Sequence, residues 1–277
     1  MSAFQTRYLS KAPRTLARPL PVQPHRWYLS PMSFCSIEWF ANSIGKAVQT
    51  NVILPNSGHG PFPVFYLLHG MSDDYSIWQR RTRIEVYVAN RPVIVVMPDG
   101  FRGRYTNNNQ GPAYFDYMTK DLVDMVERTF PAKTTRAGRC VGGLSMGGYG
   151  ALRLALGRPD MYASVNSHSG SVLGASMKLN PAKDADRIRT FGRDPRKTDH
   201  DLIELARRAK KAGRLPKILI DCGVDDSLID QNRKYVAELK KMKIDHTYRE
   251  FPGAHTWDYW DLHIREALDF HGKMLGF

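Results

Sequence analysis

The chain has 277 residues, of which 42% are hydrophobic and 24% charged, and it carries a formal net charge of +13. This composition is typical of a globular protein with a large buried core, and no apolar run reaches the roughly 18 residues that predict a membrane span. The three cysteines, Cys35, Cys140 and Cys222, have neither the spacing of metal ligands nor that of a disulfide framework. We therefore expect no metal, no cofactor and no membrane partner.

The first 35 residues differ from the rest because they are rich in proline and arginine. No acidic residue precedes Glu38, and the segment lacks the continuous apolar core of a secretory signal. We interpret residues 1–35 as a basic, flexible extension, with a transit-like segment and an upstream start codon as open alternatives. The lack of a secretory signal predicts a cytoplasmic protein.

Positive charge is concentrated in this extension and in a second segment, from Lys178 to Lys217. Such charge attracts acidic partners, nucleic acid among them. No nucleic-acid-binding motif accompanies it, however. We therefore interpret the charge as a solvated basic surface and expect no nucleic-acid partner.

Strand-like and helix-like runs alternate after about residue 36. The run at 48–55 predicts an early strand, and the hydrophobic runs at 62–70 and 92–100 end in glycine turns, as strands buried on both faces do. The stretch 113–130 predicts an amphipathic helix. Its apolar stripe consists of Phe115, Met118, Leu122 and Val126.

The second half of the chain continues this alternation. Strands are predicted at 139–145, 162–170, 216–223 and 246–253, and helices after residue 145, at 228–242 and at 257–274. The alternation predicts one α/β domain at 36–277, with a mostly parallel central sheet and helices on both faces. The connection at about 174–216 is too long for a plain loop, so we expect a basic, partly helical insertion over the sheet.

A serine lies between glycines where the strand at 139–145 ends and a helical run begins. The sequence Gly143-Leu144-Ser145-Met146-Gly147 has the Gly-x-Ser-x-Gly pattern of a nucleophile elbow, a tight turn that projects the serine from the top of a sheet. The glycines omit side chains that would collide with the neighbouring strand and helix. A glycine-rich turn with an incidental serine has the same pattern, so further support is needed.

Two later strand ends supply that support. Asp225 and Asp226 follow one predicted strand, and His255 follows the next. An elbow serine needs a base and an acid that orients this base, and α/β-hydrolases place them in the order Ser, acid, His. Ser145, one of the two aspartates and His255 therefore form a candidate catalytic triad.

Acyl transfer also requires hydrogen-bond donors for a negatively charged oxygen. One is usually the backbone N–H of the residue after the nucleophile, here Met146. The second comes from an earlier strand-end loop, and in the sequence HGMSDD the best candidate is the N–H of Met71. Both donors are backbone groups, so side-chain substitution tests them poorly.

The remaining histidines lack such a setting. His69 ends an early strand, and we expect it to shape the turn rather than to act as a base. A metal site of His69, Asp73 and Asp74 is a weaker alternative. His168 also follows a strand, but the sequence identifies no acidic partner for it.

With these residues in place, the chain resembles the esterase D family of α/β-hydrolases, which includes tributyrin, feruloyl and acetylxylan esterases, S-formylglutathione hydrolases and mycolyltransferases. The matching stretches are FYLLHGMSDDYSIW at 65–78, VIVVMPDG at 93–100, GLSMGGYGALRLAL at 143–156, CGVDDSL at 222–228 and FPGAHTWDYW at 251–260. The resemblance covers about residues 36–277. It implies the α/β-hydrolase fold, Asp226 rather than Asp225 as the acid, His255 as the base, and Met71 and Met146 as oxyanion donors.

Within this family, the sequences at 80–108 and 255–260 look most like the tributyrin-esterase branch. The resemblance implies a serine carboxylesterase that hydrolyses short acyl esters of small molecules or carbohydrates through an acyl-enzyme. The alternatives are a feruloyl or acetylxylan esterase, an acyltransferase of the same fold, and a non-enzymatic protein that binds an anionic partner. Trp257, Tyr259 and Trp260 either line the pocket or pack the last helix, and we prefer packing. The natural ester and formation of a homo-oligomer stay open.

Overall fold

The computed structural model describes residues 33–277, so residues 1–32 of the predicted extension lie outside the described residues. The first strand, β1 (Ser33–Ala41), begins within the segment that the sequence assigns to the extension. Along β1, exposed residues alternate with Cys35, Ile37 and Trp39, which pack on the core. The folded domain therefore starts slightly before position 36.

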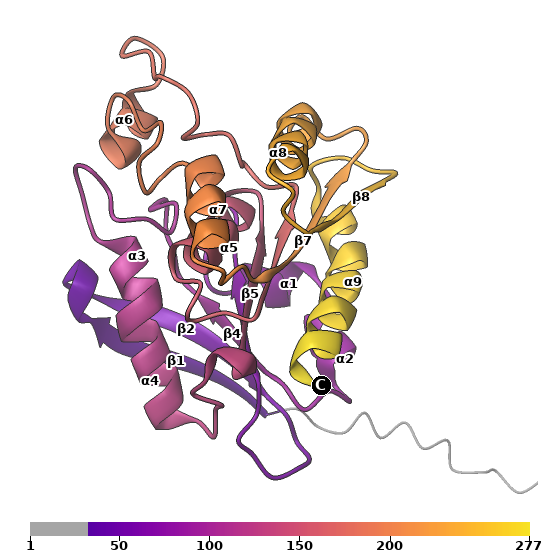
Figure 1. The fold of residues 1–277 in the computed structure, drawn as a ribbon. Coiled ribbons are helices and arrows are strands. Elements are labelled where there is room, and N and C mark those ends of the chain that lie inside the picture. The colour runs from indigo at the N-terminus through magenta and orange to yellow at the C-terminus, as the bar shows by residue number, and fades with distance from the viewer. Residues whose placement is uncertain (1–32) are drawn as a thin grey trace, which may run out of the picture.

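The described residues form an eight-stranded sheet in the order β1-β2-β4-β3-β5-β6-β7-β8 (Figure 1). β1 and β2 are antiparallel, as are β2 and β4, and all the other neighbours are parallel. The strands after β1 are β2 (Lys46–Leu54), β3 (Val64–Leu68), β4 (Ile94–Pro98), β5 (Arg139–Leu144), β6 (Ser164–His168), β7 (Lys217–Gly223) and β8 (Thr247–Phe251). The predicted parallel sheet is confirmed, and the loops after β3 and β5–β8 meet at one edge.

Helices cover both faces of the sheet, as predicted. In β3, Tyr66 and Leu68 belong to one hydrophobic core and Phe65 and Leu67 to the other, because successive strand side chains point to opposite faces. The first core packs against α4 (Leu122–Thr129), α5 (Met146–Gly157), α7 (Leu202–Lys211) and α8 (Ile229–Lys241). The second packs against α1 (Ile77–Arg81), α2 (Ile84–Val88) and α9 (Trp257–Leu275).

The helix predicted at 113–130 is present but composite. It consists of α3 (Tyr114–Asp116), a π-helical turn η2 (Tyr117–Asp121) and α4. Two 3₁₀ turns, η1 (Asn42–Ile44) and η3 (Arg136–Gly138), complete the short elements before β5.

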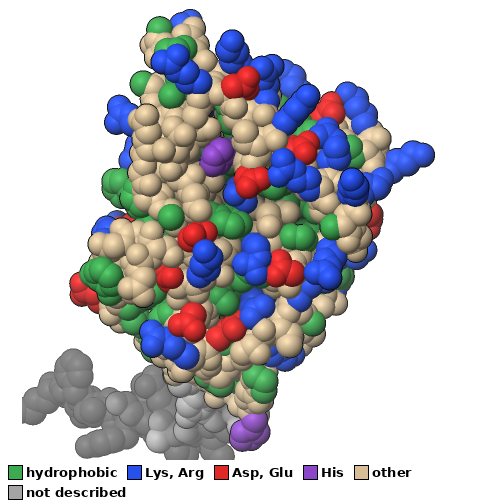
Figure 2. Space-filling view, turned by 60° about the vertical axis from the view of Figure 1, so that its left-hand side comes forward, with side chains coloured by type: hydrophobic (Ala, Val, Ile, Leu, Met, Phe, Trp, Pro, Cys, Tyr) green, Lys and Arg blue, Asp and Glu red, His purple; other side chains and the backbone are tan. Residues whose placement is uncertain are grey.

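The connection between β6 and β7 holds α6 (Ala185–Phe191) and α7. α7 packs on α5 and α8, whereas α6 lies at the outer end of the molecule (Figure 1). Basic side chains here are interspersed with acidic ones (Figure 2). Ion pairs join Arg187 to Asp184, Arg196 to Asp194, and Arg208 to Asp199 and Glu204. Part of the positive charge of this segment is therefore compensated locally.

Within residues 33–277, no helix combines the length and the apolar character that crossing a bilayer requires.

Candidate active site

The serine predicted at a nucleophile elbow lies at a sharp corner. β5 ends at Leu144, α5 begins at Met146, and Ser145 between them has φ = 53° and ψ = −113°. This left-handed φ is unfavourable for a residue with a side chain, and such strain is found at functional sites. A Cβ on Gly147 would lie 2.5 Å from the carbonyl oxygen of Leu68, so only glycine permits this close approach to β3.

The structure brings the predicted triad residues together although they come from three separate loops. His255 Nε2 lies 3.0 Å from Ser145 Oγ, within hydrogen-bond reach. On the other side of the ring, His255 Nδ1 lies 2.8 Å from Asp226 Oδ2 and 3.1 Å from Asp226 Oδ1. A carboxylate only accepts hydrogen bonds, so Nδ1 carries the hydrogen and the Nε2 lone pair faces the serine.

The backbone joins the acid loop to the histidine loop. The N–H of Val224 donates to the carbonyl of Phe251 over 2.9 Å, and the N–H of Asp225 donates to the carbonyl of Gly253 over 2.9 Å. These bonds leave Asp225 exposed and turn Asp226 inward. The geometry therefore distinguishes the two aspartates, which the residues alone did not.

The environment of Asp226 favours its charged form. Its side chain is fully buried, and burial by itself raises the pKa of a carboxyl group. Hydrogen bonds from His255 and from the Leu228 N–H, together with the influence of the Ser169 hydroxyl, outweigh burial and hold the pKa of Asp226 below its usual value. A carboxylate therefore persists beside His255 at neutral pH.

The predicted oxyanion donors lie in two segments that touch. A Cβ on Gly147 would lie 2.6 Å from the carbonyl oxygen of His69, so the loop after β3 runs against the first turn of α5. Met71 lies in this loop and Met146 is the first residue of α5. The N–H groups of a first helical turn have no partner within the helix, and among residues 33–277 the Met71 N–H has no hydrogen-bond partner.

His69 shapes the turn, as the sequence suggested. Its Nδ1 bonds to the carbonyl of Gly70 over 2.7 Å, and its Nε2 accepts the N–H of Gly100 over 2.8 Å. Both ring nitrogens are therefore occupied, and the ring ties the loop after β3 to the loop after β4. Among the described residues, no group of three or more His, Cys, Asp or Glu side chains is arranged to hold a metal ion.

His168 has an acidic partner that the sequence analysis missed. Its Nδ1 lies 2.7 Å from Asp221 Oδ2, and both side chains are buried. Asp221 lies within β7, opposite His168 of β6 in the parallel register. Only this register reveals the pair, because the two residues are far apart in the sequence.

The aromatic residues after His255 pack the start of α9. Tyr259 and Trp260 are both 4% exposed, which favours packing over a role as pocket walls. Trp260 meets the His255 ring edge-on, with centroids 4.8 Å apart, and Trp257 meets Trp78 at 5.4 Å. The contact with Trp260 limits the orientations that the His255 ring can adopt.

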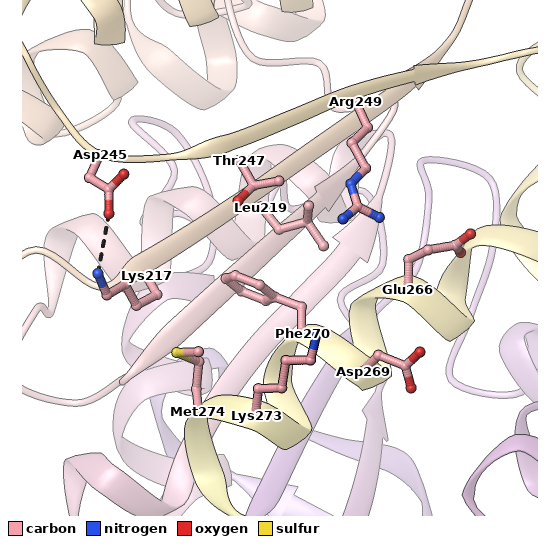
Figure 3. Close-up of a pocket in the computed structure, with 10 residues that line it drawn as sticks. All are labelled: Lys217, Leu219, Asp245, Thr247, Arg249, Glu266, Asp269, Phe270, Lys273 and Met274. Carbon is pink, nitrogen blue, oxygen red and sulfur yellow. Dashed lines mark hydrogen bonds and ion pairs between the residues drawn. The ribbon is translucent and has the colours of Figure 1, made fainter.

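A hollow of about 400 Å³ lies away from Ser145, between β7, β8 and the end of α9 (Figure 3). Its lining mixes charges with apolar groups, and Lys217 pairs there with Asp245. Lys217 begins β7, whereas Asp226 follows the other end of that strand. This hollow therefore does not serve the serine.

The strand order, the helices on both faces and the serine after β5 define the α/β-hydrolase fold of serine hydrolases. Residues 41–271 match the Esterase family model, described as "Putative esterase". The match covers most of the chain. The protein therefore belongs to this family and is a carboxylic ester hydrolase of the serine type, which confirms the resemblance inferred from the sequence.

Similar proteins have related activities. An acetyl esterase from Caldicellulosiruptor saccharolyticus is 29% identical over 220 residues, which cover 76% of this chain and 83% of that protein. The structure of FphF, a fluorophosphonate-binding serine hydrolase of Staphylococcus aureus, has a TM-score of 0.79 at 28% identity and covers 87% of this chain and 98% of its own. An S-formylglutathione hydrolase, FrmB, also from Staphylococcus aureus, has a TM-score of 0.78 at 28% identity and covers 87% and 99%.

Proposed function

We propose that the protein hydrolyses short-chain acyl esters through a triad of Ser145, His255 and Asp226. The observation that carries the proposal is the continuous hydrogen-bonded path from Ser145 Oγ to His255 Nε2 at 3.0 Å and from His255 Nδ1 to Asp226 Oδ2 at 2.8 Å. The acetyl esterase relative supports a short acyl group.

In the first step, Ser145 Oγ attacks the ester carbonyl while His255 Nε2 takes the hydroxyl proton. Asp226 holds the required tautomer and stabilises the imidazolium that forms. The N–H groups of Met71 and Met146 donate to the oxyanion of the tetrahedral intermediate. The intermediate collapses when His255 returns the proton to the leaving alcohol, which leaves the acyl group on Ser145.

In the second step, His255 takes a proton from water, and the resulting nucleophile attacks the acyl-enzyme. A second tetrahedral intermediate releases the carboxylic acid, and Ser145 regains its proton from His255. An alcohol in place of water would give acyl transfer through the same groups.

The test compares hydrolysis of p-nitrophenyl acetate, butyrate and octanoate by the wild type and by Ser145→Ala. We expect wild-type activity that falls with acyl length, and a loss of several orders of magnitude in kcat for Ser145→Ala. Wild-type turnover by Ser145→Ala would refute the assignment. Feruloyl esters, a thioester and an added alcohol, each assayed separately, would separate the alternative substrates and acyl transfer.

A further inference from the structure

A second buried histidine–aspartate pair adjoins the triad without taking part in the proposed chemistry. The carbonyl oxygen of His168 accepts the N–H of Ser145 over 2.9 Å, so His168 holds the backbone of the elbow. The His168 ring donates to Asp221 over 2.7 Å, because a carboxylate can only accept. The other carboxylate oxygen of Asp221 accepts the hydroxyl of Tyr259 over 3.0 Å.

Ser169, the residue that follows His168, links this pair to Asp226. Ser169 is buried, has φ = 47°, and donates its N–H to the carbonyl of Asp221 over 2.8 Å. Its hydroxyl is one of the groups that lower the pKa of Asp226, the acid of the proposed triad. Ser145 and Ser169 thus both have left-handed φ values at the ends of neighbouring strands. A residue other than glycine keeps such a backbone conformation only where several surrounding contacts hold it in place.

Tyr259, the last residue in this series of contacts, packs against the loop that carries His255. Tyr259 packs so closely on Gly253 that a Cβ there would lie 2.8 Å from the Tyr259 ring. Gly253 precedes His255 by two residues, and its carbonyl accepts the N–H of Asp225 over 2.9 Å. The contacts therefore run from the backbone of the nucleophile, through the sheet, to the loop that carries the base.

We propose that His168, Asp221 and Tyr259 form a positioning network that sets the distance between Ser145 and His255. This inference rests on the proposed function of these two residues. The network moves no proton of the reaction. It fixes the elbow and the histidine loop to one buried carboxylate, and loss of either donor leaves that carboxylate under-satisfied and free to shift.

The first test removes one hydroxyl. Tyr259→Phe deletes the donor to Asp221 and keeps the ring, and Tyr66→Phe is the matched control because the Tyr66 hydroxyl is buried without a partner among the described residues. We expect Tyr259→Phe to lower the acylation rate and kcat by about 10-fold to 100-fold at unchanged KM, since small misplacements of reacting groups cost this much. Tyr66→Phe is expected to match the wild type.

The burst amplitude with p-nitrophenyl acetate reports the fraction of competent sites, so lost folding is separated from slower chemistry. A Tyr259→Phe protein with a full burst and a wild-type acylation rate would overturn the proposal. So would a loss confined to burst amplitude, because that outcome marks a purely structural role.

The second test uses rescue at His168. His168→Asn retains a side-chain N–H that can reach Asp221, whereas His168→Leu does not. We expect the acylation rate per competent site to be at least about tenfold higher in His168→Asn than in His168→Leu. Equal rates in the two variants would overturn the network. Wild-type activity in the Ser145→Ala variant would instead refute the proposed function, so failure of the network and failure of the proposed function are distinguishable.

Discussion

Replacing Asp226 by asparagine changes one atom of the site, and the structure predicts where that atom goes. Asp226 Oδ1 accepts the N–H of Leu228 over 2.8 Å, so an oxygen must remain at that position. The amide nitrogen of Asp226→Asn then takes the place of Oδ2, which lies 2.8 Å from His255 Nδ1. Because the amide nitrogen donates, Nδ1 must accept, and the ring hydrogen moves to Nε2.

A ring with its hydrogen on Nε2 cannot take the proton of Ser145. The same substitution in a serine protease triad lowers kcat by about 10⁴-fold with the geometry intact. At about 1.36 kcal/mol for each factor of ten, this loss corresponds to roughly 5 kcal/mol of transition-state stabilisation. We expect a loss of this order for Asp226→Asn, with KM little changed.

The assay is the steady-state hydrolysis of p-nitrophenyl acetate, with Asp225→Asn as the control. Asp225 adjoins Asp226 and is exposed, so its substitution removes the same charge without touching His255. Asp225→Asn is expected to retain wild-type kcat. An Asp226→Asn enzyme within about tenfold of the wild type would contradict the tautomer argument, as would a large loss in Asp225→Asn alone.

Two further predictions concern the fold around the site. Gly147→Ala places a Cβ 2.5 Å from the Leu68 carbonyl oxygen, whereas the nearest atom to a Cβ on Gly174 is 3.5 Å away. Gly147→Ala should therefore lower the free energy of unfolding in urea by about 1–3 kcal/mol. The clash is supported if Gly147→Ala loses this stability while Gly174→Ala keeps a value near that of the wild type. Burial lowers the pKa of His271 to about 3, below the roughly 6.5 of an unfolded chain. Below pH ~6.5 the unfolded chain therefore binds a proton that the folded chain excludes, and stability is lost as the pH falls toward 3. Urea titrations from pH 7 to 4 should show a shallower loss for His271→Asn than for the wild type or for exposed His59→Asn; parallel curves would contradict this origin.

Patterns of hydrophobicity were sufficient to predict the parallel strands: β3 and β4 are apolar along their whole length, and β5 is apolar after Arg139. They did not predict β1, which is an edge strand with one solvated face and begins within the segment that the sequence assigns to the proline-rich extension. The helices α1 and α2 span only five residues each, too few for a helical period to be recognised.

Some residues of the site could likewise be predicted from the sequence, and others could not. Ser145 and His255 were identifiable because each follows a predicted strand in the order that the chemistry requires. The choice between Asp225 and Asp226 needed the family resemblance, and in the structure it follows from which carboxylate the loop turns inward. The pairing of His168 with Asp221 could not be predicted from the sequence, because it depends on the register of β6 against β7.

The central claim is that an acyl group resides on Ser145 during turnover. Wild-type enzyme mixed with p-nitrophenyl acetate, quenched in acid and digested with trypsin yields the peptide 140–153, in which Ser145 is the only serine or threonine. The account predicts that mass spectrometry finds one acetyl group on Ser145 of this peptide in the wild type and none on it in Ser145→Ala. An acetyl group on Cys140 or Tyr149 instead, or turnover without any acetylated peptide, would contradict it.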